Sequence, residues 1–169
     1  VLNGFRPSNS FRRLIRKNAD LIGTQCPPET GREQYDLLRR YLDARHEHGG
    51  MADMAPSDYV AMVEETAVDT FVMEYRTPDG ELIACLLADR MQDGISLVYS
   101  FFDPRAEKRS LGSFMILDQI ARAQETNAAH VYLGYLIEDC RKMAYKKRFA
   151  PLQKLGQNGW ENYILPRAK

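Results

Sequence analysis

The stretch from Ile95 to Pro151 constrains the fold more than any other part of the chain. It contains two continuous apolar runs, ISLVYSFF (95–102) and HVYLGYLI (130–137), separated by a segment that is densely apolar from Leu111 to Ile120. Apolar runs of this length predict buried strands, and the segment between them predicts a helix with Ser110 as its N-cap. Strand, helix and strand in this order favour a parallel pair inside a covered sheet. We therefore predict an α/β (α+β) fold.

The residues before this stretch predict antiparallel hairpins. FVMEYR (71–76) and ELIACLLADR (81–90) are followed by Asp79-Gly80 and Asp93-Gly94, and D-G is a strong signal for a tight hairpin turn. VLNGF (1–5) is expected to form an edge strand. GQNGWENYIL, after Pro151, is expected to form a final strand. The sequence thus predicts a mixed central sheet flanked by helices, within a single domain over residues 1–169.

Four further segments carry signals for helices. Their expected starts are Ser8 or Ser10, a capping box of Thr30 and Glu33, the residues after Pro56-Ser57, and Asp139. The second helix should run to about residues 46–48 and end at Gly49-Gly50. The third should bury Val60 and Val63, and the fourth should be basic and end before Pro151.

Composition limits the classes of function. Lysine plus arginine and aspartate plus glutamate number 23 each, so any contact with a nucleic acid must come from local clusters of charge. No apolar run approaches the roughly 20 residues of a membrane span, and no signal-peptide pattern is present. Cys26, Cys85 and Cys140 are too far apart in sequence for a metal motif and are odd in number. We expect no metal, no membrane partner and a cytoplasmic location.

The turn after the strand at 95–102 is the place where chemistry is expected, because ligands of open α/β sheets bind at the carboxyl ends of strands. The turn carries Arg109 and Ser110, and Arg109-x-x-Gly112 is a partial form of the pyrophosphate loop of GNAT acyltransferases. Phe114 replaces the final small residue of that loop. An ordinary capped helix with solvated charges is the alternative interpretation.

Longer motifs are more specific. VYSFFDP (98–104), RSLGSFMILDQI (109–120), YLGYLI (132–137) and RKMAYKKRFAP (141–151) resemble the aminoacyl-tRNA–protein transferases of the N-degron pathway. The block YLDARH (41–46), followed by GGM and SDY, resembles the bacterial branch in particular. The resemblance covers essentially the whole chain.

The resemblance implies a GNAT-like fold and transfer of leucine, or less typically arginine, from charged tRNA to proteins that begin with Asp or Glu. It implies no cofactor, because the aminoacyl-tRNA is itself the donor substrate. Members of the family also carry an N-terminal region with clustered cysteines, which nothing in this chain matches. We therefore expect the chain to be a fragment that lacks this region.

Such a reaction needs no covalent nucleophile, because the aminoacyl ester is already activated. It needs groups that orient the amine and the ester, stabilise the oxyanion and protonate the departing ribose oxygen. The candidates at the strand ends are Tyr99, Ser100 and Tyr135 for catalysis, with Gly134 allowing a substrate to approach the backbone. Buried core tyrosines are the alternative for the two aromatic residues.

Charged residues supply the candidates for substrate binding. An arginine is the best clamp for an acidic acceptor side chain, because its guanidinium can bind both carboxylate oxygens, and Arg45 or Arg109 is expected in this role. Lys142 and Lys146 suit an anion, either a tRNA phosphate or the acceptor's carboxylate. A solvated surface is the alternative for each of them. The complete set of expected substrate-binding residues is Arg45, His46, Arg109, Ser110, Gly112, Gly134, Lys142, Tyr145 and Lys146.

The densest basic cluster lies near the start of the chain and consists of Arg12, Arg13, Arg16 and Lys17. It predicts a sequence-independent contact with the tRNA backbone, unless it is only a solvated helix face. Two other functions remain open for the chain as a whole. One is a CoA-dependent N-acyltransferase of the same fold, which Phe114 disfavours, and the other is a non-catalytic fragment that binds tRNA or N-degrons.

Overall fold

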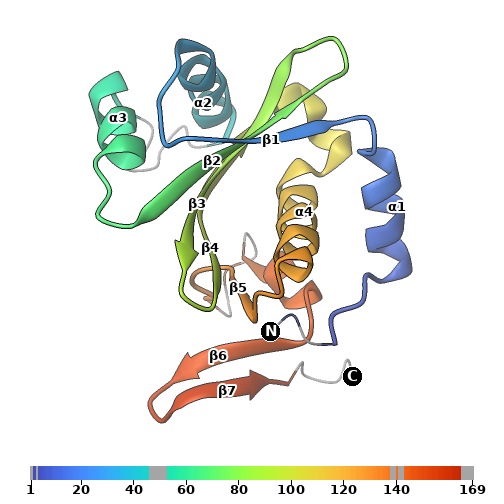
Figure 1. The fold of residues 1–169 in the computed structure, drawn as a ribbon. Helices are drawn as coiled ribbons and strands as arrows, with labels where there is room; N and C mark the ends of the chain where they lie inside the picture. Colours follow the sequence, from blue (N-terminus) through green and yellow to red (C-terminus); the bar gives the residue numbers. More distant parts are fainter. Residues whose placement is uncertain (1, 3, 46–52, 138–139, 141–142, 165–169) are drawn as a thin grey trace.

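A five-stranded sheet forms the centre of the protein. The computed structural model describes residues 2, 4–45, 53–137, 140 and 143–164. The strands lie in the order β1-β2-β3-β4-β5, and all neighbours are antiparallel except β4 and β5, which are parallel (Figure 1). The bounds are β1 Ile22–Cys26, β2 Asp69–Arg76, β3 Leu82–Met91, β4 Gly94–Phe102 and β5 His130–Tyr132.

Helices cover both faces of this sheet. The helices α2 and α3 lie on one face, and α1 and α4 lie on the other (Figure 1). There are also two short 3₁₀ helices. The first, η1, follows β4, and the second, η2, precedes a separate two-stranded hairpin of β6 and β7. The bounds are α1 Asn9–Lys17, α2 Arg32–Arg45, α3 Pro56–Glu64, η1 Pro104–Arg109, α4 Leu111–Glu125, η2 Ala144–Arg148, β6 Leu152–Gly156 and β7 Gly159–Tyr163.

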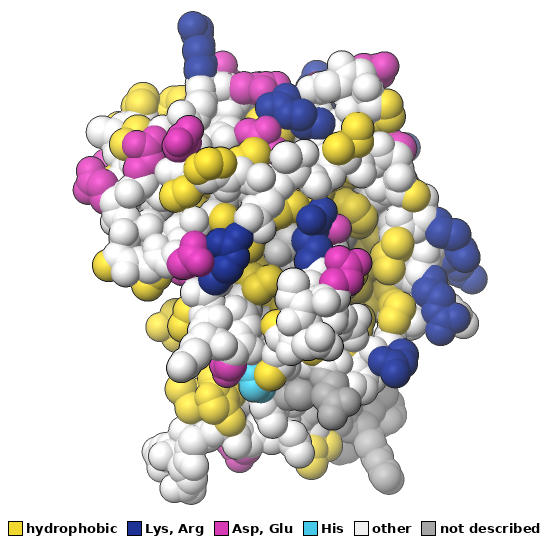
Figure 2. Space-filling view, viewed as in Figure 1, with side chains coloured by type: hydrophobic (Ala, Val, Ile, Leu, Met, Phe, Trp, Pro, Cys, Tyr) yellow, Lys and Arg dark blue, Asp and Glu magenta, His cyan; other side chains and the backbone are white. Residues whose placement is uncertain are grey.

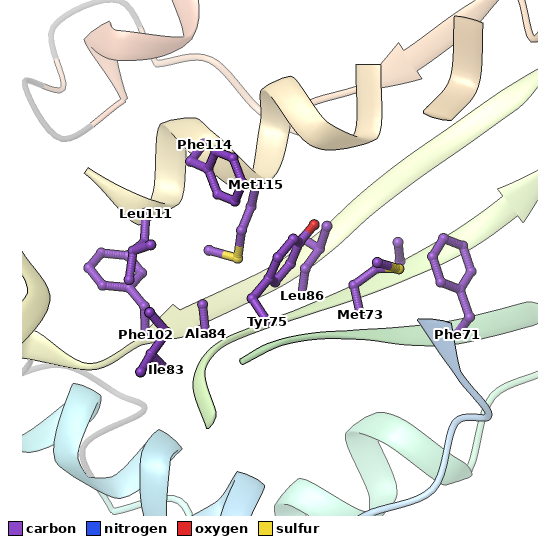
Figure 3. Packing of buried hydrophobic residues seen from close by; sticks show 11 residues of the cluster. Phe71, Met73, Tyr75, Ile83, Ala84, Leu86, Phe102, Leu111, Phe114 and Met115 are labelled. Atoms are coloured by element: carbon purple, nitrogen blue, oxygen red, sulfur yellow. The ribbon is translucent and has the colours of Figure 1, made fainter. Parts of the chain in front are cut away.

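The larger core lies between the sheet and α4. Leu111 and Met115 on α4 are completely buried, and the rings of Phe114 and Tyr75 meet edge to face with centroids 5.8 Å apart (Figure 3). Burying side chains of this size contributes about 1.5–3 kcal/mol each. Because α2 and α3 fill the other face, β3 is buried along seven consecutive residues from Leu82 to Ala88. A strand covered on both faces has this continuous apolar pattern.

The predicted mixed sheet and its two hairpins are confirmed, but one glycine has a different role. The turn between β3 and β4 is formed by Gln92 and Asp93, so Gly94 is the first residue of β4 and pairs with Met91. Gly94 also lies opposite His130 of β5. A Cβ on Gly94 would lie only 2.2 Å from the carbonyl oxygen of His130. Glycine is therefore required here by the close approach of β5.

Three predicted strands differ from the structure. The described residues of 1–5 form no strand, because Leu2 and Phe5 are buried beside α4 and anchor the chain to the core. The second apolar run forms a strand only at His130–Tyr132 and leaves the sheet before Gly134, whose φ is +70°. The final segment forms a hairpin, β6–β7, because its QN turn (157–158) reverses the chain.

The predicted helix starts agree with the structure better in their positions than in their capping hydrogen bonds. Ser8 caps α1 through its hydroxyl, which accepts a hydrogen bond from the Phe11 N–H. The prediction of a capping box at Thr30 is wrong, because the Thr30 hydroxyl and N–H both donate to Glu64 of α3. Ser110 precedes α4 but has φ 51° and makes no side-chain cap.

The remaining helix predictions have mixed outcomes. The helix α3 buries Val63 together with Tyr59, whereas Val60 is half-exposed. The prediction of a basic helix before Pro151 is wrong for residues 143–149, where the structure has the single 3₁₀ segment η2. Its predicted cap, Asp139, and the predicted stop at 49–50 lie outside the described residues.

The close approach at Gly94 leads to a prediction about stability. Gly94→Ala should destabilise the fold by about 1–3 kcal/mol or more, because the new methyl group overlaps backbone of β5. Gly112→Ala, on the first turn of α4, is the matched control. Its Cβ would make an ordinary contact 3.4 Å from Phe102, and alanine favours helix. Urea denaturation of both variants measures the difference, and equal stability would contradict the proposed role of Gly94.

Candidate active site

The two parallel strands separate after three residue pairs. Ser96 and Tyr132 are the last partners, and a β-bulge follows on β4 between Leu97 and Tyr99. A bulge bends its strand and raises the local twist. Beyond Ser96, the outer edge of β4 has no strand neighbour in the part of the chain that the structure describes. This open edge, together with the start of η1, forms one side of the candidate site.

Tyr99 lies on the open part of β4. Its hydroxyl is buried and has no hydrogen-bond partner among the described residues. Burial, with a smaller effect of Tyr41, raises the pKa of Tyr99 to about 12. The phenol is therefore neutral near pH 7 and is available as a hydrogen-bond donor. Burying an unsatisfied hydroxyl costs about 1–3 kcal/mol, so this group is a natural candidate for contact with a ligand.

Tyr41 of α2 is close enough to influence tyrosines on two other elements, Tyr99 of β4 and Tyr145 of η2. Tyr41 of α2 packs on Phe102, with ring centroids 5.0 Å apart, and influences the pKa of both Tyr99 and Tyr145. Burial raises the pKa of Tyr145 in η2. Tyr41 is not among the site residues that the sequence predicts, although it begins the YLDARH block. The position of Tyr41 in this block was the sequence signal that could have identified it as a site residue.

Ser100 and Tyr99 do not act on the same side of the sheet. Tyr99 packs against the core of α2 and α3. Successive residues of a strand point to opposite faces, so Ser100 faces α4. The structure therefore separates two residues that the sequence analysis placed together as catalytic candidates.

The turn from η1 to α4 is held by the end of α1. Arg109 donates to Asp20 at 2.6 Å, and the Arg109 carbonyl accepts a hydrogen bond from Asn18. The Arg109 guanidinium lowers the pKa of Asp20. Arg109 is thus paired through Nη2, while its Nη1 is buried without a hydrogen-bond partner among the described residues. Gly112 lies in the first turn of α4 against Phe102.

A cavity of about 500 Å³ lies beside the open end of β5. One wall is the segment that follows β5, including Gly134, and the opposite wall is the β6–β7 hairpin. Lys146 of η2 reaches this cavity and donates to the Tyr135 carbonyl at 2.8 Å. Burial lowers the pKa of Lys146. The Tyr135 side chain is 88% exposed, so it is not the core residue that the alternative interpretation expected.

The basic cluster of α1 is on the surface. Arg12, Arg13, Arg16 and Lys17 are all exposed, and Figure 2 shows dark-blue side chains along the edge of the molecule where α1 lies in Figure 1. The 3₁₀ segment η2 joins this edge, because Arg148 lies 4.9 Å over the Phe11 ring. Arg148 of η2 is therefore a spatial neighbour of α1 although the two are more than a hundred residues apart.

Three expected site residues lie wholly or partly outside the described residues. His46 and Lys142 lie outside the described residues, and only the backbone of Arg45, at the end of α2, is described. Among the described residues, no group of three or more His, Cys, Asp or Glu side chains is arranged to hold a metal ion. None of the described helices is both long and apolar enough to cross a membrane.

Solved structures share the fold. A ribosomal-protein-alanine N-acetyltransferase from Brucella melitensis superimposes with a TM-score of 0.59 and 12% identity, covering 88% of this chain and 99% of that one. L-PGS from Bacillus licheniformis gives a TM-score of 0.60 and 14% identity, covering 95% of this chain and 55% of that one. These likenesses confirm the GNAT-like acyltransferase fold that the sequence predicts.

Sequence comparison is more specific. An aspartate/glutamate leucyltransferase from Parvibaculum lavamentivorans is 53% identical over 160 residues, covering 95% of this chain and 66% of that protein. One from Mesorhizobium japonicum is also 53% identical, over 94% of this chain and 66% of its own length. The chain thus spans slightly less than two thirds of these relatives. The pattern described as "Arginine-tRNA-protein transferase, C terminus" matches residues 33–156, and the chain belongs to this family.

Proposed function

We propose that the protein transfers leucine from Leu-tRNA to the α-amine of proteins that begin with Asp or Glu. The observation that carries this proposal is the 53% identity to aspartate/glutamate leucyltransferases over nearly the whole chain. Leucine is favoured over arginine because these relatives are named for leucine. We place the reaction in the cytoplasm, where charged tRNA and nascent proteins meet.

The chemistry requires little from the protein. The acceptor amine attacks the ester carbonyl carbon, a new amide bond forms, and the bond from that carbon to the ribose oxygen breaks. The proton lost by the amine balances the proton gained by the departing oxygen. An α-amine has a pKa of roughly 7.7–8.0, so a useful fraction is neutral near pH 7. Orientation and stabilisation of charge are therefore the main tasks of the site.

Tyr99 fits the stabilising role. Its hydroxyl is neutral, buried and unpartnered within the described residues, so it can donate a hydrogen bond to the oxyanion or to the departing ribose oxygen. A phenol with a raised pKa is a poor base near neutral pH. We therefore assign Tyr99 the role of a hydrogen-bond donor, with Tyr41 near it.

Transfer of an acyl group from CoA is a weaker candidate. The fold is shared with N-acetyltransferases, but a shared fold does not determine the donor. Phe114 is 8% exposed and packs on Tyr75, so a large ring fills the position where the phosphate loop of GNAT enzymes has a small residue. This argues against a pyrophosphate in that loop.

The test is a comparison of donors. The whole protein is incubated with radiolabelled Leu-tRNA, Arg-tRNA or acetyl-CoA and with peptides that differ only in a first residue of Asp, Glu or Lys. We expect label from Leu-tRNA on the Asp and Glu peptides. Label from acetyl-CoA, or binding of tRNA without transfer, would support one of the two alternatives.

Arg13 and Arg16 should contribute to tRNA affinity by neutralising phosphates, because both are exposed and unpaired within the described residues. In Arg13→Gln/Arg16→Gln, the slope of log affinity against log salt should fall in magnitude by about 0.7–0.9 for each phosphate that is no longer neutralised. Arg32→Gln/Arg90→Gln is the control with the same change of charge. Filter binding of Leu-tRNA across a salt series measures both, and identical slopes would exclude α1 from the tRNA surface.

Tyr99→Phe should separate activity from stability. Removal of an unsatisfied hydroxyl should leave the fold as stable or up to about 1 kcal/mol more stable, whereas transfer should fall by about 10²–10³-fold. Tyr59→Phe is the matched control, because the Tyr59 hydroxyl donates to Gln34 at 3.0 Å within the core. The control should lose about 1 kcal/mol of stability and keep its activity. Single-turnover rates and thermal unfolding give the two readouts, and a fully active Tyr99→Phe would remove Tyr99 from the mechanism.

A further inference from the structure

Lys146 differs from the other lysine that lines the cavity beside β5. The Lys154 ammonium lies 3.5 Å from the Glu161 carboxylate, so its charge is already balanced. Lys146 donates to a neutral partner, the Tyr135 carbonyl, and has no carboxylate partner among the described residues. Lys146 therefore brings an unbalanced positive charge to the cavity.

The walls of the cavity favour a ligand with a negative charge beside Lys146. They are predominantly apolar and include Leu133, Leu152 and Trp160. Charges interact more strongly in such surroundings than in water, and a half-buried cation gains most from a partner of opposite charge. A neutral side chain of the same shape would leave the ammonium uncompensated. The pocket can thus distinguish a carboxylate from the corresponding amide.

The backbone leaves room at the lysine head. Gly134 has φ +70°, and a Cβ added there would lie 3.8 Å from the Lys146 nitrogen. The neighbouring Tyr145 is influenced by Tyr41, which also influences Tyr99. Tyr41 thus connects the Tyr99 region with η2, whose next residue, Lys146, lines the cavity.

We propose that this cavity holds the first residue of the acceptor protein and that Lys146 recognises its side-chain carboxylate. The inference rests on the proposed function and names the residue that gives it acidic specificity. It differs from the expected arginine clamp: Arg109 already forms an ion pair with Asp20, and the Arg45 side chain lies outside the described residues. A tRNA phosphate is the less suitable partner, because a phosphate backbone stays solvated and fits the exposed cations of α1 better than an apolar cavity.

The experiment compares peptides that begin with Asp or Asn and are otherwise identical. Lys146→Met keeps a long apolar side chain and removes the charge, and Lys147→Met is the control from the same 3₁₀ segment. In Lys146→Met the preference for Asp over Asn in kcat/KM should fall by roughly 10- to 100-fold, the scale of removing a charge-assisted hydrogen bond. The change should lie in the acceptor KM, with the KM for Leu-tRNA unaltered. Lys146→Arg should keep the preference, and Lys147→Met should match the unaltered protein.

A second readout needs no transfer. Trp160 is the only tryptophan of the chain and lines the cavity, so its fluorescence reports on occupancy. The Asp peptide should change this fluorescence at lower concentration than the Asn peptide, and Lys146→Met should remove the difference. An unchanged preference in Lys146→Met would overturn the inference, as would a fluorescence change caused by a CCA trinucleotide and by neither peptide. Failure of the proposed function looks different, because the fluorescence preference would then persist without any transfer of leucine.

Discussion

The site depends on the short ladder between β4 and β5, which has three residue pairs. Gly94 allows the two backbones to approach closely, and two residue pairs later the ladder ends. The bulge at Leu97–Tyr99 then bends β4 away while the chain after β5 turns off at Gly134. Close contact at one end and separation at the other create an open edge within an otherwise covered sheet. Tyr99, whose hydroxyl is buried, belongs to this part of β4.

The rest of the architecture keeps this opening fixed. The helices on both faces bury the middle of β3 completely, so the sheet cannot close the gap by shifting its strands. On one side, the pair of Arg109 and Asp20 fixes the turn into α4 to the end of α1. On the other, α2 supplies Tyr41 against Phe102. Several packed elements thus hold one unsatisfied hydroxyl in place.

Much of the fold could be predicted from the sequence, because burial on two faces leaves a clear pattern. The apolar runs, the D-G hairpins and the Ser8 cap identified most elements. The pattern failed where tertiary contacts decide: residues 133–136 are as apolar as a strand but line a cavity, and Thr30 bonds to Glu64 on a neighbouring helix. Sequence similarly indicated Tyr99 and Lys146 as candidates. The burial of the Tyr99 hydroxyl and the pairing of Arg109 depend on residues distant in sequence, so only the structure could distinguish these candidates.

The β6–β7 hairpin has a thermodynamic consequence. Among the described residues it forms no ladder with the main sheet, and an isolated two-stranded hairpin is only marginally stable in water. Its attachment includes side-chain packing such as the 5.8 Å contact between Trp160 and Tyr132. A molecule that fills the cavity would add contacts to both walls, so binding and docking of the hairpin are linked equilibria. Amide protons of β6 and β7 should then exchange more slowly when the cavity is filled, while those of β3 keep their rate.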